Sequence, residues 1–192
     1  MEEIKIGKQV WMSENLNVET FRNGDPILHA KTAEEWEKAG KNKQPAWCYY
    51  DNRSVQNDPE NGENYGKLYN WYAVADSRGL APKGWHIPTD DEWTVLTNFL
   101  GGEQGAGAML KSKTGWSNNG NGTNSSGFNG LPGGFRNYDG TFGSIGKDGY
   151  WWSSTEYSTE DARLRGLIYN SGNVYRDYSS KGRGFSVRCL RD

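Results

Sequence analysis

Four segments close to the C-terminal end of the chain decide the fold. They are YWWSST at 150–155, ARLRGLIY at 162–169, NVYRDY at 173–178 and GFSVRCL at 184–190. Each is a short run with aromatic and branched side chains, which is typical of β-strands. The residues NSG at 170–172 favour a turn between the second and third segments. The sequence therefore predicts that these four strands form one antiparallel sheet.

The last of these segments predicts which face of that sheet is buried. Its apolar positions are Phe185, Val187 and Cys189, and Ser186 and Arg188 lie between them. Successive side chains of a strand point to opposite faces of the sheet. One face should therefore be core, and the loops and the opposite face are free to carry a recognition surface.

Two helices are predicted before the sheet. The first, near 66–79, has a single apolar stripe at helical spacing and is followed by Pro82. The second, near 89–100, begins with a capping box formed by Thr89 and Glu92. Its buried face should be formed by Trp93, Leu96 and Leu100. Both stripes indicate core packing.

The rest of the chain supplies shorter elements. We expect a hairpin between Ile4 and Met12, a helix capped by Thr32 that stops at Gly40, and a strand at 46–50. The stretches 51–64 and 113–149 are rich in Asn, Gly and Ser and are predicted to be loops. Helices followed by an antiparallel meander indicate a single, loop-rich α+β domain over 1–192.

Composition excludes several classes of protein. The chain has 26 Gly, nine Trp and eleven Tyr in 192 residues, which argues against both disorder and a helical bundle. The net charge of −2 offers no electrostatic basis for nucleic-acid binding. No apolar run approaches the roughly 20 residues of a membrane span, and the start at Met1 has no signal-peptide pattern.

Five ordered motifs resemble the Fibrobacter succinogenes major paralogous domain. They are YGKLYNWY at 65–72, GWHIPT at 84–89, EW at 92–93, WSSTE at 152–156 and GFSVRC at 184–189. The similarity extends from about Ile4 to Asp192. More distantly, the IPT and EW motifs, GGFR at 133–136 and the final GF look like segments of the formylglycine-generating enzymes.

These resemblances imply a C-type-lectin-like fold with two main helices flanking antiparallel sheets. They also imply an exported or cell-surface protein of a bacterium or phage, and a subset of the family resembles the variable proteins of diversity-generating retroelements. Such a fold brings early and late strands together, so Cys48 and Cys189 are candidates for a disulfide; two buried thiols are the alternative.

The residues give little support to catalysis. His29 and His86 lie in unrelated contexts, and His86, beside Trp85 and ahead of a helix cap, is expected to be structural. The formylglycine-generating enzymes use two nearby cysteines late in the chain, where this chain has only Cys189. We therefore predict no enzyme activity and no cofactor.

Calcium is the one ion that the sequence leaves open. The stretch 51–64 carries oxygen ligands without the spacing of an EF-hand loop. These candidate ligands are Asp51, Asn52, Asn57, Asp58, Glu60 and Asn64.

The late strands are instead predicted to bind a protein or glycan ligand. Tyr and Arg, which are enriched in recognition hot spots, are concentrated there. The predicted ligand-contacting residues are Tyr157, Ser158, Asp161, Arg163, Leu164, Tyr175, Asp177, Tyr178, Ser180 and Arg183.

Five of these residues give the prediction its sharpest form. The side chains of Arg163, Tyr175, Asp177, Tyr178 and Arg183 should be exposed on one patch. A plain solvated sheet, a structural domain of a surface assembly and an unrecognised enzyme are the alternatives.

Overall fold

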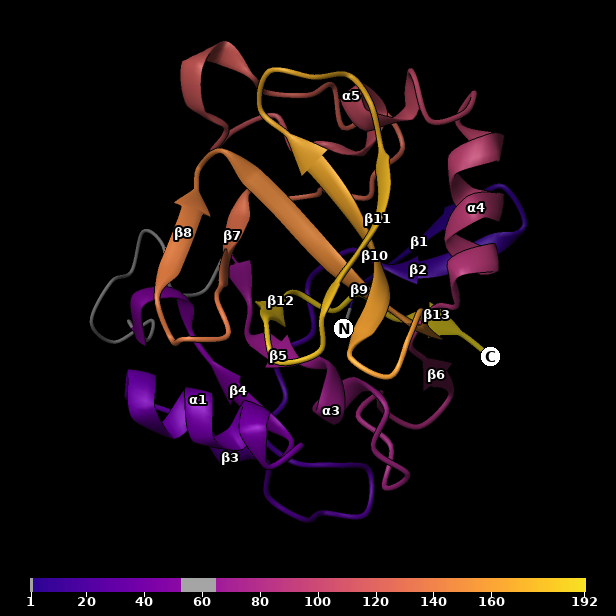
Figure 1. Ribbon diagram of the computed structural model, residues 1–192. Coiled ribbons are helices and arrows are strands. Elements are labelled where there is room, and N and C mark those ends of the chain that lie inside the picture. The colour runs from indigo at the N-terminus through magenta and orange to yellow at the C-terminus, as the bar shows by residue number, and fades with distance from the viewer. Residues whose placement is uncertain (1, 53–64) are drawn as a thin grey trace.

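A nine-stranded sheet and a four-stranded sheet organise the computed structural model, which describes residues 2–52 and 65–192 (Figure 1). In spatial order the large sheet contains β11 (Tyr175–Ser180), β10 (Asp161–Ile168), β9 (Asp148–Glu156), β7 (Gly133–Arg136), β12 (Gly184–Phe185), β5 (Leu68–Asn70), β4 (Ala46–Cys48) and β3 (Leu28–His29), with β8 (Phe142–Ile145) paired to β7. The small sheet contains β1 (Glu3–Ile6), β2 (Gln9–Met12), β13 (Leu190–Arg191) and β6 (Trp85–His86).

The helices are short and pack around these sheets. Among the described residues they are α1 (Ala33–Lys41), α3 (Trp71–Val74), α4 (Asp90–Phe99) and α5 (Ala106–Leu110), with single 3₁₀ turns η1 (Tyr50–Asn52) and η2 (Ser117–Asn119). The class is α+β and loop-rich. None of the helices described here is long and apolar enough to cross a membrane.

Both faces of the large sheet are buried near β9. Trp151 and Trp152 are neighbours on this strand, so their side chains point to opposite faces. Trp151 packs in a cluster with Trp93 of α4, whereas Trp152 packs in a cluster with Trp71 of α3. Each face is thus covered by a different helix.

Several predicted elements are confirmed. The N-terminal hairpin forms as β1 and β2, and the Thr32 capping box begins α1. The Thr89 and Glu92 capping box begins α4, whose Trp93 and Leu96 are buried as predicted. β9, β10 and β11 form an antiparallel meander.

The predicted helix near 66–79 is wrong. Leu68, Tyr69 and Asn70 form β5, and only one helical turn, α3, follows. The Asn70 side chain accepts a hydrogen bond from the Ala73 amide, so it caps a helix that begins at Trp71. Because β5 is buried on both faces, its sequence shows no alternation and its apolar residues imitate helical spacing.

The predicted loop at 113–149 contains a strand pair, β7 and β8. Two glycines begin β7, a residue type depleted in strands. At Gly134, φ is +63° and an added Cβ would lie 2.4 Å from the Gly143 carbonyl oxygen. Glycine is therefore required where β7 approaches β8 closely.

The prediction that all four late strands share one antiparallel sheet is also wrong. Segment 184–190 divides into β12, which lies between β7 and β5, and β13, which joins the small sheet. The large sheet is mixed, since β7 pairs with β9 in parallel. Nor is only one face of 184–190 buried: Ser186 and Arg188 are as inaccessible as their apolar neighbours.

Arg188 shows why a polar residue occupies this buried segment. Its guanidinium donates to the Met12 and Phe128 carbonyl oxygens and, at 2.7 Å, to Asn15 Oδ1. Burial lowers the pKa of Arg188 to about 9. This side chain ties the C-terminal segment to the N-terminal hairpin and to the loop before β7.

Candidate functional site

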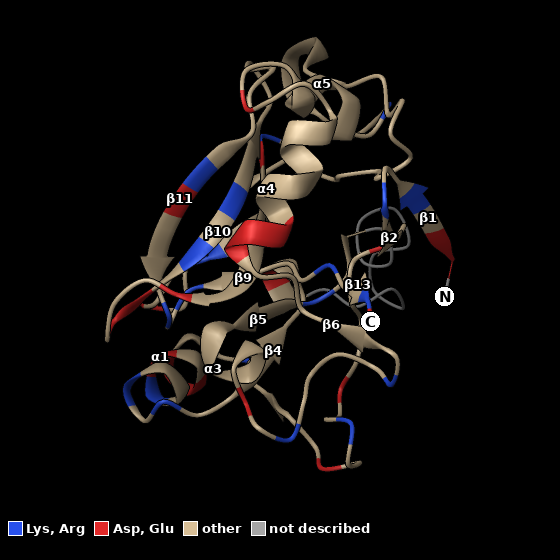
Figure 2. Ribbon diagram, turned by 90° about the vertical axis from the view of Figure 1, so that its right-hand side faces the viewer, with Lys and Arg blue, Asp and Glu red and all other residues tan. Residues whose placement is uncertain are grey.

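The β10–β11 hairpin is fixed to the first turn of α4 by a buried carboxylate. Asp90 pairs with Arg165 of β10 and accepts a 2.8 Å hydrogen bond from Arg176 Nε of β11. Arg165 Nη2 also donates to Thr94 Oγ1 at 2.9 Å. Figure 2 shows this acidic turn of α4 beside the basic residues of β10 and β11.

Electrostatics favours this arrangement. Burial raises the pKa of Asp90, but hydrogen bonds from Arg176 and Arg165 outweigh burial and hold that pKa below its usual value. Most of the predicted ligand-contacting residues lie on the β10–β11 hairpin. Ion pairs between Asp90 of α4 and two arginines of this hairpin therefore hold it against the core.

The strand register divides those residues between two faces. Arg163 lies opposite Tyr178, and Leu164 lies opposite Asp177. Because neighbouring side chains of a strand point to opposite faces, Tyr178 shares the face of Arg163, whereas Asp177 and Tyr175 share that of Leu164. The predicted single patch is thus two surfaces.

The first surface is built around two stacked tyrosines. The rings of Tyr157 and Tyr178 lie 4.1 Å apart between centroids at an angle of 19°, and the Arg163 guanidinium lies 4.3 Å from the Tyr157 centroid. Both tyrosines are 47% exposed. We name this the Tyr157–Tyr178 surface, and it comprises Tyr157, Ser158, Asp161, Arg163, Tyr178 and Ser180.

Hydrogen bonds fix the backbone of the β9–β10 turn, which carries part of this surface. The Ser158 hydroxyl accepts a hydrogen bond from the Asp161 amide at 3.0 Å. The buried Lys181 ammonium donates to the Ser158 and Thr159 carbonyl oxygens at 2.8 and 2.7 Å and pairs with Glu156. The backbone that carries Tyr157 is therefore positioned before any ligand arrives.

The second surface contains Tyr175, Asp177 and Arg183. Tyr175 and Asp177 are exposed, whereas Arg183 is half-buried, donates from Nε to Asn137 Oδ1 at 3.0 Å and lies 5.5 Å from the centre of the Phe135 ring. Tyr150 lies on the same face, and burial together with Asp148 raises its pKa to about 12. Arg183 and Tyr150 of this face are engaged in internal contacts, whereas Tyr175 and Asp177 are open to solvent.

Leu164 does not belong to either surface. Its side chain is buried in the cluster that contains Trp152 and Phe185. The prediction that Leu164 contacts ligand is wrong because β10 turns this residue toward α3 and the core.

The two cysteines are free thiols in the structure, and no disulfide joins them. Trp47 and Cys48 are neighbours on β4 and point to opposite faces. Cys189 packs with Trp47 in one cluster, whereas Cys48 packs with Leu68 in another. The sheet therefore separates the two thiols, and burial raises the pKa of each to about 12.

The proposed calcium ligands fall largely outside the described residues. Asn57, Asp58, Glu60 and Asn64 lie in the undescribed segment 53–64. Asn52 Nδ2 donates to the Lys31 carbonyl oxygen at 2.6 Å. Within residues 2–52 and 65–192, no group of three or more His, Cys, Asp or Glu side chains could hold a metal ion.

His86 has partners that sequence reasoning missed. Its Nδ1 lies 2.9 Å from Asp192 Oδ1 and its Nε2 lies 2.9 Å from Glu92 Oε1. Desolvation lowers the pKa of His86, but the hydrogen bonds to Asp192 and Glu92 outweigh it and the net pKa is raised. Glu92 also closes the α4 capping box, so His86 joins β6, α4 and the C-terminal residue of the chain.

A family model confirms the family that the five sequence motifs indicate. A search of curated proteins finds no match. The family model described as "Fibrobacter succinogenes major domain" matches residues 4–191. Because this match spans nearly the whole sequence, the chain belongs to the Fibrobacter succinogenes major domain family.

Proposed function

We propose that this chain is a non-catalytic ligand-binding domain and that the Tyr157–Tyr178 surface contacts the ligand. The observation that carries the proposal is the exposed stack of Tyr157 and Tyr178 with Arg163 against it. Tyr and Arg are the residue types enriched in binding hot spots. Tyrosine rings offer a large contact area with few rotatable bonds to immobilise.

Preorganisation also supports this assignment. Lys181 holds the β9–β10 turn, and Asp90 holds β10 and β11, so little chain ordering remains to oppose binding. The second surface, around Tyr175 and Asp177, is the matched comparison because it lies on the same edge strand and faces the other way.

The two thiols support a non-catalytic role. Burial raises the pKa of Cys48 and of Cys189 to about 12, which leaves little nucleophilic thiolate near neutral pH.

The proposal extends to the biological setting. The ligand is a protein or a glycan, and the domain belongs to an exported or cell-surface protein of a bacterium or phage. We also propose a C-type-lectin-like fold, which is supported by the pairing of β13 with β2 near the two ends of the chain. A role among the variable proteins of diversity-generating retroelements belongs to the same proposal.

Arrays of glycans and surface proteins test this function. The purified domain and a Tyr157→Ala/Tyr178→Ala variant would be applied in parallel, with folding of both checked by circular dichroism. We expect ligands that bind the wild type and are lost with the variant. Equal signals from both proteins would exclude this surface, and absence of any ligand on both arrays would favour a structural domain of a surface assembly.

A further inference from the structure

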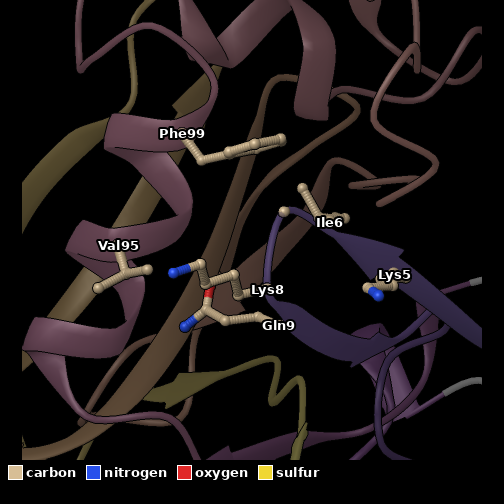
Figure 3. A pocket seen from close by; sticks show the side chains of 7 residues that line it. Lys5, Ile6, Lys8, Gln9, Val95 and Phe99 are labelled. Carbon is tan, nitrogen blue, oxygen red and sulfur yellow. The ribbon is translucent and has the colours of Figure 1, made fainter.

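An apolar groove lies between α4 and the β1–β2 turn. It has a volume of about 590 Å³, and its lining residues come from α4 and the β1–β2 hairpin alone: Lys5, Ile6, Gly7, Lys8, Gln9, Val95 and Phe99. Figure 3 shows Val95 and Phe99 projecting from the helix, with Lys8, Gln9 and Ile6 across from them. In Figure 2, β1 and β2 lie on one side of α4 and β10 and β11 on the other.

Two side chains at the groove, Val95 and Phe99, are exposed to water although neither carries a polar atom. Val95 is 53% exposed and Phe99 is 62% exposed. The other large exposed hydrophobic side chains among the described residues are tyrosines, whose hydroxyl groups can remain in water. Val95 and Phe99 are four residues apart on α4, so they share one helix face.

The helix and the turn fit each other closely. The hairpin turn places Gly7 at φ +62°, and a Cβ added there would lie 2.9 Å from the Phe99 ring. Phe99 therefore rests against the turn with its outer face open, and α4 is joined to β2 by a 3.0 Å hydrogen bond from Gln9 Nε2 to the Glu92 carbonyl oxygen. The two walls are held together without a ligand.

The charged residues that line the groove are both lysines. Lys5 and Lys8 are exposed, and the lining contains no carboxylate, although the whole chain has a net charge of −2. An occupant that satisfies both features combines apolar side chains with negative charge. Since two elements alone form the lining, the groove covers one side of its occupant, which suits a segment of a partner protein.

We propose that this groove docks an acidic, amphipathic peptide segment of a partner protein. Phe and Leu side chains of the segment would contact the exposed Val95 and Phe99 side chains, and Asp or Glu side chains would pair with Lys5 and Lys8. This docking surface is independent of the Tyr157–Tyr178 surface, because different residues on different elements form it.

The probe is a short synthetic peptide in which Asp and Glu alternate with Phe and Leu. A basic peptide with the same apolar residues and an acidic peptide with Ser in place of Phe and Leu serve as controls. Binding to the full chain would be measured by fluorescence anisotropy and mapped by amide chemical shifts. Vesicles of phosphatidylcholine and phosphatidylglycerol test a membrane surface as the occupant.

Variants assign the binding to the groove. Phe99→Ser and the double variant Lys5→Glu/Lys8→Glu should each weaken binding of the acidic amphipathic peptide by at least about tenfold, as expected for loss of interface anchors. Lys83→Glu and Tyr138→Ser, which change exposed residues outside the groove lining, should bind as the wild type does. Raising the salt concentration should weaken wild-type binding, because exposed ion pairs are screened.

Four results would contradict the docking of an acidic, amphipathic peptide in this groove. Equal binding of the basic peptide, unchanged binding by the groove variants, binding to vesicles in place of peptide, or no binding of the acidic amphipathic peptide would each overturn the proposal. Folding of every variant would be confirmed by its melting curve, and a variant that fails to fold leaves the remaining one and the peptide controls to decide.

Discussion

Tyr157 and Tyr178 stack with ring centroids 4.1 Å apart and so join the β9–β10 turn to the edge strand β11. Neither ring is buried, and Arg163 lies against Tyr157. Stacked aromatic pairs contribute about 0.5–1.5 kcal/mol beyond area burial, which is small beside the stability of a domain. This contact therefore shapes the surface more than it stabilises the fold.

Leu164 and Arg163 should respond oppositely to truncation, although they are neighbours. Leu164→Ala removes a buried side chain from the Trp152 cluster and should lower the free energy of unfolding by about 2–5 kcal/mol. Arg163→Ala, at a half-buried position, should cost about 1 kcal/mol or less. Urea denaturation of both variants is the measurement, and similar losses would contradict the assignment of the two faces.

Asp90 should be essential for stability, whereas its neighbour Asp91 should not be. Asp90→Asn leaves Arg165 buried without its carboxylate and should cost about 3 kcal/mol. Asp91→Asn changes an exposed carboxylate on the same helical turn and should cost less than about 1 kcal/mol. Because the folded-state pKa of Asp90 is lowered, its contribution is present above the unfolded value and is lost as the pH falls through the folded value. Equal stability of the two variants would contradict this role.

His86 should stabilise the folded chain most at acidic pH. Its folded-state pKa is raised by Asp192 and Glu92, so its contribution is complete below the unfolded value of about 6.5 and is lost as the pH rises through the folded value. His86→Gln should remove that pH dependence from the stability profile.

His29 provides a comparison of opposite sign. Burial lowers its folded-state pKa, so its titration should reduce stability as the pH falls below about 6.5. Chemical denaturation across this pH range with His86→Gln and His29→Gln separates the two contributions. A flat difference between wild type and His86→Gln would show that the two carboxylates do not stabilise protonated His86.

Both cysteines should be reduced and unreactive in the native state. Burial raises the pKa of Cys48 and Cys189 to about 12, so a thiol reagent such as dithionitrobenzoate should label neither until the chain unfolds. Without reductant, the unfolded protein should then release a full equivalent for each thiol. Failure to label either cysteine after unfolding would indicate the disulfide that the structure lacks.

The sequence predicted what depends on local chemistry. Thr32 with Glu35 and Thr89 with Glu92 identify the starts of α1 and α4, because capping boxes satisfy backbone amides within a few residues. Runs of aromatic and branched residues, with the NSG turn at 170–172, located β9, β10 and β11.

Other features depended on distant partners. Leu68 and Tyr69 form a strand only because β4 and β12 flank them, and Ser186 and Arg188 are buried only because the segment is covered on both sides. The division of the predicted site follows from register: Asp177 and Tyr178 are adjacent in sequence and face opposite ways. Alternation along β11 could have revealed that division. The Val95 and Phe99 groove had a weaker signal, two apolar residues off the Trp93 and Leu96 stripe of α4.

The most direct test compares two tyrosines of one strand. With a ligand found on the arrays, isothermal titration calorimetry would measure its affinity for Tyr178→Ala and Tyr175→Ala, which are 47% and 39% exposed in the wild type. If the Tyr157–Tyr178 surface binds the ligand, Tyr178→Ala should lose about 2 kcal/mol or more and Tyr175→Ala about 0.5 kcal/mol or less, with both melting temperatures nearly unchanged. A loss confined to Tyr175→Ala would place recognition on the opposite face of the sheet and contradict the account.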